Sequence, residues 1–114
     1  MESILTSTKK LLGISQDDDS FDTDIIFHIN TAFSILSQMG IGPEDGFRIT
    51  DDTTVWSDYT QDDIMLDMVK SYIPMKVRKM FDPPTSSAVM ECLNKIIEEL
   101  EQRLYVEFEI RKKR

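Results

Sequence analysis

Residues 71–90, SYIPMKVRKMFDPPTSSAVM, determine how the two longest predicted helices are joined. Pro74 lies inside an apolar pattern that otherwise predicts a helix, and because proline has no N–H to donate we expect a kink there. Pro83 and Pro84 end this helix, since a residue that precedes a proline avoids helical backbone angles. A Ser or Thr among residues 85–87 then caps the next helix. No nucleophile–base pair accompanies these residues, so we interpret the stretch as a joint between helices.

The helix before this joint is predicted to begin near Asp62 and Asp63 and to be apolar on two faces. One face consists of Ile64, Met68, Tyr72 and Met75. The other consists of Leu66, Val69, Ile73, Val77 and Met80. A helix with two apolar faces is buried on two sides, so this helix is either central in a bundle or inserted between subunits.

The helix after the joint has one apolar stripe, which consists of Val89, Leu93, Ile96, Ile97, Leu100 and Leu104. Beyond Leu104 the period changes, because Val106, Phe108 and Ile110 alternate with charged residues and only a strand would bring them to one face. We therefore predict an extended arm over residues 106–114 that adds to the edge of another chain. Pairing with a hairpin of the same subunit and a frayed helical end are the alternatives.

Two shorter helices are predicted nearer the N-terminus. Ser3 caps the first, at about residues 4–12, and a cluster of Ser and Asp at residues 20–24 begins the second, which Gly40 ends. Phe27 lies on the polar side of the second helix, which suggests a contact with another chain. The alternative is that a loop of the same subunit covers Phe27.

Two β-prone runs follow the second helix, FRIT at residues 47–50 and TVWS at residues 54–57, and we predict that they form a short hairpin. Trp56 and Tyr59 are its expected packing anchors, because a lone hairpin is marginally stable in water. The predicted fold is therefore mainly α, a small bundle of about four helices with one short β-hairpin and an extended C-terminal tail.

The chain of 114 residues has a net charge of −8, and the charges are unevenly distributed. Residues 1–64 contain 13 acidic and 3 basic residues, whereas residues 65–114 contain 8 acidic and 10 basic ones. This asymmetry favours head-to-tail stacking on copies of the chain or on a partner, or it merely keeps a monomer soluble. No apolar run approaches the ~20 residues that span a bilayer, so we expect a soluble protein with no membrane partner.

Residues suited to catalysis or metal binding are few. His28 is the single histidine, expected to be packed or half-exposed, and Cys92 is the single cysteine, expected to be a small buried thiol that can form no internal disulfide. The acidic runs at residues 17–19 and 51–52 lack the spacing of oxygen ligands in an EF-hand loop. We predict that the chain is not an enzyme and binds no cofactor or metal.

Three segments carry a resemblance to a known family. FRITDDTTVWSDY (residues 47–59), VKSYIPMKVRKMFDPPTSS (69–87) and IIEELEQRLYVE (96–107), in this order and spacing, resemble the small head-to-tail connector, or head-completion adaptor, proteins of tailed bacteriophages and prophages. The resemblance extends from about residue 20 to residue 107. Gln102 departs from it, because an aromatic residue is more frequent there in the family.

The resemblance implies a helical connector domain, here residues 1–105, and a role as a structural adaptor in the virion. It implies a ring, commonly of about twelve copies, that lies under the portal protein, lines the DNA channel and joins the next head-completion or tail protein. Before assembly the protein would be in the bacterial cytoplasm. The candidate partner interface consists of Phe27, Tyr105, Val106, Phe108, Ile110, Arg111, Lys112, Lys113 and Arg114.

A different function remains open from the residues alone. The basic C-terminus could make the chain a small helical module that binds nucleic acid or regulates a partner. This hypothesis predicts a salt-sensitive affinity for DNA that is lost when the four terminal basic residues, Arg111 to Arg114, become alanine.

Overall fold

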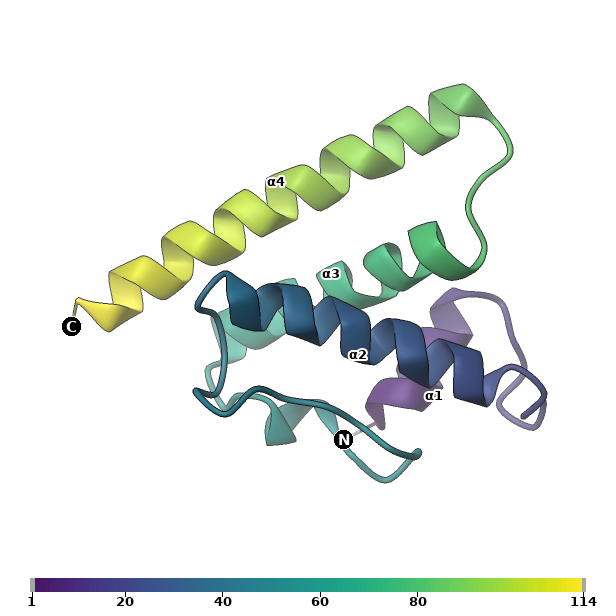
Figure 1. Cartoon of the computed structure of the whole chain (residues 1–114), viewed down its shortest axis with the longest axis horizontal. Helices are drawn as coiled ribbons and strands as arrows, with labels where there is room; N and C mark the ends of the chain where they lie inside the picture. The colour runs from purple at the N-terminus through teal and green to yellow at the C-terminus, as the bar shows by residue number, and fades with distance from the viewer. Residues whose placement is uncertain (1, 114) are drawn as a thin grey trace.

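The structure is a computed structural model that describes residues 2–113. Four α-helices, α1 (Ile4–Leu11), α2 (Asp22–Gln38), α3 (Asp63–Phe81) and α4 (Ser87–Lys112), and one 3₁₀ turn, η1 (Trp56–Asp58), form its regular elements. Figure 1 shows α3 and α4 running antiparallel, with α2 alongside α3 and with α1 on the side away from α4. The molecule is flat, with principal extents of 43 × 35 × 21 Å.

Three of the four helices begin at polar caps, as the sequence predicts. Helix α2 is the exception and that part of the prediction is wrong: its N-cap is Phe21, which makes no side-chain capping hydrogen bond, and Asp22 and Asp24 lie in its first turn. The Ser3 side chain accepts a hydrogen bond from the backbone N–H of Thr6 at 2.9 Å. Asp62 caps α3 through the N–H groups of Ile64 and Met65, and the predicted cap within residues 85–87 is Ser86. Each side-chain oxygen satisfies an N–H that has no partner inside its helix.

Helix α3 is central in the bundle, which decides between the two predictions made for it. It packs against α1, α2, η1 and α4 of its own subunit. Its buried residues come from both predicted faces and are Met65, Leu66, Val69, Tyr72, Ile73, Pro74 and Val77. Most of its apolar surface therefore stabilises the single subunit and is not available for contacts between subunits.

The predicted hairpin is wrong, and the backbone hydrogen bonds show why. The side-chain amide of Asn30 on α2 donates to the carbonyl of Ile49 at 2.9 Å and accepts from its N–H at 2.8 Å. The carbonyl of Thr54 accepts from the N–H of Ile4 at 3.0 Å, and Val55 forms an isolated bridge with Ser3. The two β-prone runs therefore pair with different helices and not with each other.

The packing anchors of this region are nevertheless correctly predicted. Trp56 and Tyr59 are both buried. The indole N–H of Trp56 donates to the hydroxyl of Ser7 on α1 at 3.0 Å. Their side chains hold the segment against the bundle in the way that a hairpin would have required.

The predicted extended arm is also wrong, because α4 continues to Lys112. The proposed boundary between residues 105 and 106 lies inside this helix. The prediction assumed that Val106, Phe108 and Ile110 must share one face. In the helix, Phe108 packs against the core while Val106 and Ile110 are exposed, so the alternation marks two faces of α4.

The proline joint ends α3 as predicted. Asp82 has φ −143° and ψ 69°, outside the helical region, and Pro83 and Pro84 follow it in the turn to α4. Pro74 is buried inside α3, and the helix continues on both sides of it. The kink expected at Pro74 stays a prediction.

The acidic and basic halves of the sequence come into contact at the end of α3. A ring contact between Phe21 and Phe81, with centroids 5.6 Å apart, brings the acidic residues before α2 close to the basic end of α3. In the same region, buried Lys9 forms an ion pair with Asp22 at 2.8 Å and donates to the carbonyl of Asp18 at 2.7 Å.

Within residues 2–113, no helix is long and apolar enough to cross a membrane.

Candidate assembly surfaces

Among the described residues, Phe27 is the most exposed aromatic side chain, with 67% of its surface accessible. It lies in a shallow groove, here called the α2 groove, between the outer face of α2 and residues 45–48. The groove is lined by Thr23, Ile26, Phe27, Asn30, Thr31 and Ser34 of α2 and by Asp45, Gly46, Phe47 and Arg48. Residues 45–48 form one wall and leave Phe27 uncovered, so a loop of the same subunit does not bury it.

The wall of the α2 groove is held in place from behind. The bonds between Asn30 and Ile49 fix the backbone next to it. The rings of Phe33, Phe47 and Tyr59 pack together with centroid distances of 4.8, 4.9 and 5.1 Å. Because these contacts exist without a partner, the groove is preformed and a ligand would not have to order it.

Gly42 allows Tyr59 to occupy its buried position. A Cβ on Gly42 would lie 2.5 Å from the Tyr59 hydroxyl oxygen, and the glycine has φ +92°. Burial raises the pKa of Tyr59 to about 12, because the charged phenolate would lose its hydration. The tyrosine therefore stays neutral and acts as a packing residue.

A row of aromatic rings extends the apolar surface from the α2 groove to the end of α3. Phe27 contacts His28 and His28 contacts Phe81, with centroids 5.6 and 6.2 Å apart. Phe81 in turn contacts Phe21, which is 44% exposed. His28 is half-buried among these rings, as the sequence predicts.

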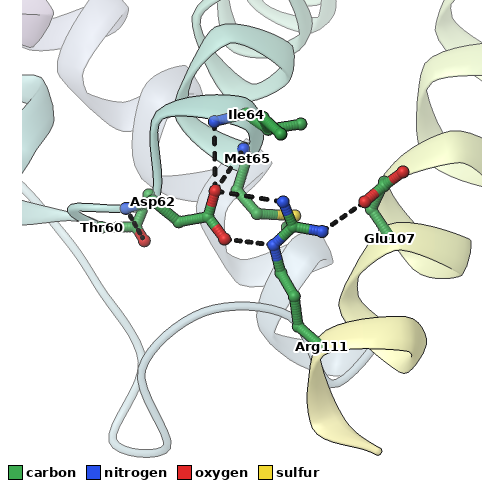
Figure 2. A network of polar contacts seen from close by, with 6 residues as sticks. All are labelled: Thr60, Asp62, Ile64, Met65, Glu107 and Arg111. Atoms are coloured by element: carbon green, nitrogen blue, oxygen red, sulfur yellow. Dashed lines mark hydrogen bonds and ion pairs between the residues drawn. The ribbon is translucent and has the colours of Figure 1, made fainter. Parts of the chain in front are cut away.

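The end of α4 is attached to the start of α3 by the polar network of Figure 2. Arg111 donates to both carboxylate oxygens of Asp62 and also to Glu107. The same Asp62 carboxylate accepts hydrogen bonds from the backbone N–H groups of Ile64 and Met65. The backbone N–H of Asp62 donates to the hydroxyl of Thr60 at 3.2 Å. The Arg111 hydrogen bond lowers the pKa of Asp62, because it stabilises the carboxylate.

The structure divides the predicted C-terminal interface into inward and outward residues. Arg111 belongs to the network within its own subunit, and Phe108 is half-buried against the core. Tyr105, Val106 and Ile110 are exposed to 43%, 45% and 42%. Lys112 and Lys113 are also exposed. Arg114, the last residue of the predicted interface, lies outside the described residues.

Val106 and Ile110 of α4 and its C-cap residue, Lys113, are spaced so that they lie on the outer side of the helix, and we call them the α4 stripe. The helix keeps this face in place because its inner side is bound along its length. Near its middle, the hydroxyl of Tyr72 donates to Glu101 at 2.7 Å and Lys76 lies 3.4 Å from the same carboxylate. At its end, the Arg111 network performs the same role.

The sequence prediction missed a further exposed apolar area on the first half of α4. Val89 and Ile96 of the predicted inner stripe are 52% and 44% exposed. Cys92, expected to be buried, is exposed beside them, so that prediction is wrong. Val89, Cys92 and Ile96 are themselves at helical spacing, and this second line of apolar residues could have indicated the exposed area from the sequence.

Helix α3 and the end of α1 add two single exposed apolar residues, Ile64 at 59% and Leu11 at 64%. No group of three or more His, Cys, Asp or Glu side chains in the described part of the chain is arranged to hold a metal ion. The surfaces described above share exposed apolar side chains, which are typical of contacts with other macromolecules.

Comparison with known proteins identifies the family. Residues 4–111 match the family described as phage connector protein. The match begins at the first residue of α1 and ends one residue before the end of α4, so it includes the α2 groove and most of the α4 stripe. Neither the curated proteins nor the solved structures contain a significant match. The chain belongs to the phage connector protein family.

Proposed function

We propose that the chain is a head-to-tail adaptor, a structural protein without enzymatic activity that forms a ring under the portal protein of a tailed phage or prophage. Membership of the phage connector family supports a structural role in the virion, in association with other head or tail proteins. In this proposal the ring lines the DNA channel, and its far side joins the next head-completion or tail protein.

The observation that carries the proposal is the presence of separate exposed apolar surfaces on one small subunit. The α2 groove contains Phe27 at 67% exposure, and the α4 stripe contains Val106 and Ile110 at 45% and 42%. Contiguous apolar patches on a soluble protein mark interaction sites. Two unlike surfaces on one subunit fit a heterologous contact, which produces a ring when the rotation between copies closes.

The net charge of −8 supports passage of DNA without tight binding. Tight binding requires clustered Lys and Arg to neutralise phosphates. An acidic channel wall would repel DNA and leave it free to slide. We place the assembled ring at the head–tail junction and the free subunit in the host cytoplasm.

The alternative function, nucleic-acid binding through the basic C-terminus, has less support. Arg111 is bound to Asp62 and Glu107 within its own subunit, so it cannot readily contact phosphates. Among the described residues of that cluster, only Lys112 and Lys113 remain exposed.

Electron microscopy of the purified chain, alone and mixed with its portal protein, tests the proposed function. We expect closed rings, or density for the chain on the tail-facing side of the portal. A control mixture with portal from an unrelated phage should show no density for the chain on that portal. A chain that stays monomeric, does not bind its portal and is dispensable for infectious particles would contradict the proposal.

A further inference from the structure

We propose that the α2 groove of one copy receives the α4 stripe of a second copy. This inference rests on the proposed function, because it assumes that the chain assembles with copies of itself. It goes further by naming the two surfaces that meet and the charges that orient them.

The α4 stripe cannot fill the groove of its own subunit. Phe108 packs against its own bundle, and with Lys112 it lines a hollow formed by residues 37–44. Val106 and Ile110 are each two positions from Phe108, about 200° around the helix axis. They therefore point away from the body of their own subunit, and only another molecule can cover them.

Each surface offers a few apolar side chains that can pack against the other, although most of the side chains that line the groove are polar or charged. The α2 groove offers the exposed ring of Phe27 together with Ile26 and Phe47, which are partly buried. The α4 stripe offers Val106 and Ile110, two β-branched side chains that lie one helical turn apart. Stiff β-branched side chains lose little conformational entropy when they are covered, so a preformed groove and a rigid helix form a favourable pair.

The two surfaces also match in charge. Asp45 lines the groove, and Asp24 lies on α2 one turn before Phe27. Both carboxylates are exposed, and Arg48 is the one basic residue among the residues that line the groove. The lining itself carries one acidic and one basic side chain, Asp45 and Arg48, and Asp24, which lies just outside the lining, adds a second carboxylate beside Phe27.

The end of the α4 stripe is basic. Lys113 lies about one turn after Ile110, and Lys112 is exposed next to it. Neighbouring Arg111 is already neutralised by Asp62 and Glu107. We place Lys113 of one copy close to Asp24 of the next when Ile110 contacts Phe27.

This contact is heterologous, because each copy gives its α4 stripe to one neighbour and receives the stripe of the other neighbour in its groove. Such contacts continue from copy to copy until they close a ring. A single subunit with one surface blocked can therefore still use the other.

A mixing experiment uses this asymmetry. Phe27→Asp blocks the groove and leaves the stripe intact, whereas Ile110→Asp blocks the stripe and leaves the groove intact. Both residues are exposed, so the subunit fold should be unchanged by circular dichroism. Sedimentation velocity at a concentration at which the wild type assembles should show each variant self-associating at least tenfold more weakly. An equimolar mixture should form dimers and nothing larger.

A mixture that forms no dimer, or variants that each assemble like the wild type, would overturn this inference. In the second case the rings themselves would remain, so the proposed function would survive. A wild type that neither assembles nor binds portal protein would instead contradict the proposed function.

A cross-linking measurement keeps the inference testable if an aspartate variant fails to fold. In a Cys92→Ser background, the pair Asp24→Cys and Lys113→Cys should form disulfides between neighbouring copies on the portal under mild oxidation. The expected product is a ladder of linked subunits on a non-reducing gel. The control pair, Glu91→Cys and Lys113→Cys, should give no ladder. Equal ladders from both pairs, or none from the first, would exclude the proposed contact.

Discussion

Arg111 binds the carboxylate that caps α3, so one residue pair, Arg111 and Asp62, connects the last turn of α4 to the first turn of α3. The residues are 49 positions apart in the sequence. Because α4 is also bound near its middle by Tyr72 and Lys76 through Glu101, its inner face is fixed at two points. These contacts on the inner face also hold the outer face, with the α4 stripe, in position.

This pair predicts how stability depends on pH. The pKa of Asp62 is lowered in the folded protein, first by the hydrogen bond from Arg111. A carboxyl with a lowered pKa adds stability above its unfolded pKa of about 3.9, and this contribution is lost as the pH falls through the lower folded pKa. We expect Arg111→Met to reduce the loss of stability between neutral and acidic pH. Urea unfolding at a series of pH values measures this change in the free energy of unfolding.

The control for that experiment is Arg103→Met. Arg103 makes an exposed ion pair with Glu99 one turn earlier in the same helix. An identical pH profile for wild type and Arg111→Met would show that the pair adds nothing to the pH dependence of stability. Asp18 and Asp51 also have a lowered pKa, from hydrogen bonds with Ser20 and Thr53, so the difference between proteins is the quantity to compare.

Asn30 is predicted to hold the wall of the α2 groove. Asn30→Ala removes both hydrogen bonds to the backbone of Ile49, which is buried. Leaving a buried backbone group without a partner costs about 1–3 kcal/mol. We expect the free energy of unfolding to fall by about this amount and hydrogen exchange at residues 45–50 to accelerate. Ser34→Ala, an exposed position on the same groove, is the matched control and should change neither quantity.

Gly42 is predicted to tolerate no side chain. In Gly42→Ala the new Cβ would lie 2.5 Å from the Tyr59 hydroxyl, at a backbone φ of +92°. The left-handed region alone costs roughly 1–2 kcal/mol for an L-residue, and the displacement of Tyr59 adds to it. Gly13→Ala, with φ +78° and open space around the Cβ, isolates the backbone part. Thermal unfolding of both variants should show the larger loss for Gly42→Ala, and equal losses would argue against the contact.

Truncation of two neighbouring residues of α4 should have different effects on the stability of the subunit. Ile97 is 2% exposed and Ile96 is 44% exposed. Replacing a buried isoleucine by alanine typically costs about 2–5 kcal/mol, while exposed sites change by about 0.5 kcal/mol or less. We therefore expect Ile97→Ala to destabilise the subunit and Ile96→Ala to leave it unchanged in chemical denaturation. A comparable loss from both would mean that the first half of α4 packs more closely against the bundle.

The helices could be predicted from the sequence because their signals are local. Ser3, Asp62 and the turn at Pro83 mark helix ends by chemistry that acts within a few residues. The absence of the hairpin could not be predicted, because the partner of Ile49 comes from a distant part of the sequence. Asn30 on α2 makes both hydrogen bonds to the backbone of Ile49. A β-prone pattern does not identify the partner of a strand.

The candidate surfaces were predictable in part for the same reason. Phe27 could be found because its position opposite the apolar stripe of α2 is a property of one helix. The arm over residues 106–114 was mispredicted because its alternating pattern was interpreted as one apolar face of a strand, whereas α4 presents Phe108 to the core and Val106 to the outside. The role of Arg111 depends on Asp62 and could be seen only in three dimensions.

Replacement of Pro74 is predicted to affect assembly more than the stability of the subunit. Pro74 is buried in the middle of α3, where it can donate no hydrogen bond to the preceding turn. In Pro74→Ala that bond can form, and we expect α3 to straighten and move the turn that leads to α4. Because alanine is the better helix former, subunit stability should change less than formation of the proposed ring. Electron microscopy should show fewer closed rings, whereas the exposed control Pro43→Ala should assemble normally. Normal rings from Pro74→Ala would show that the shape of α3 at this proline does not determine assembly.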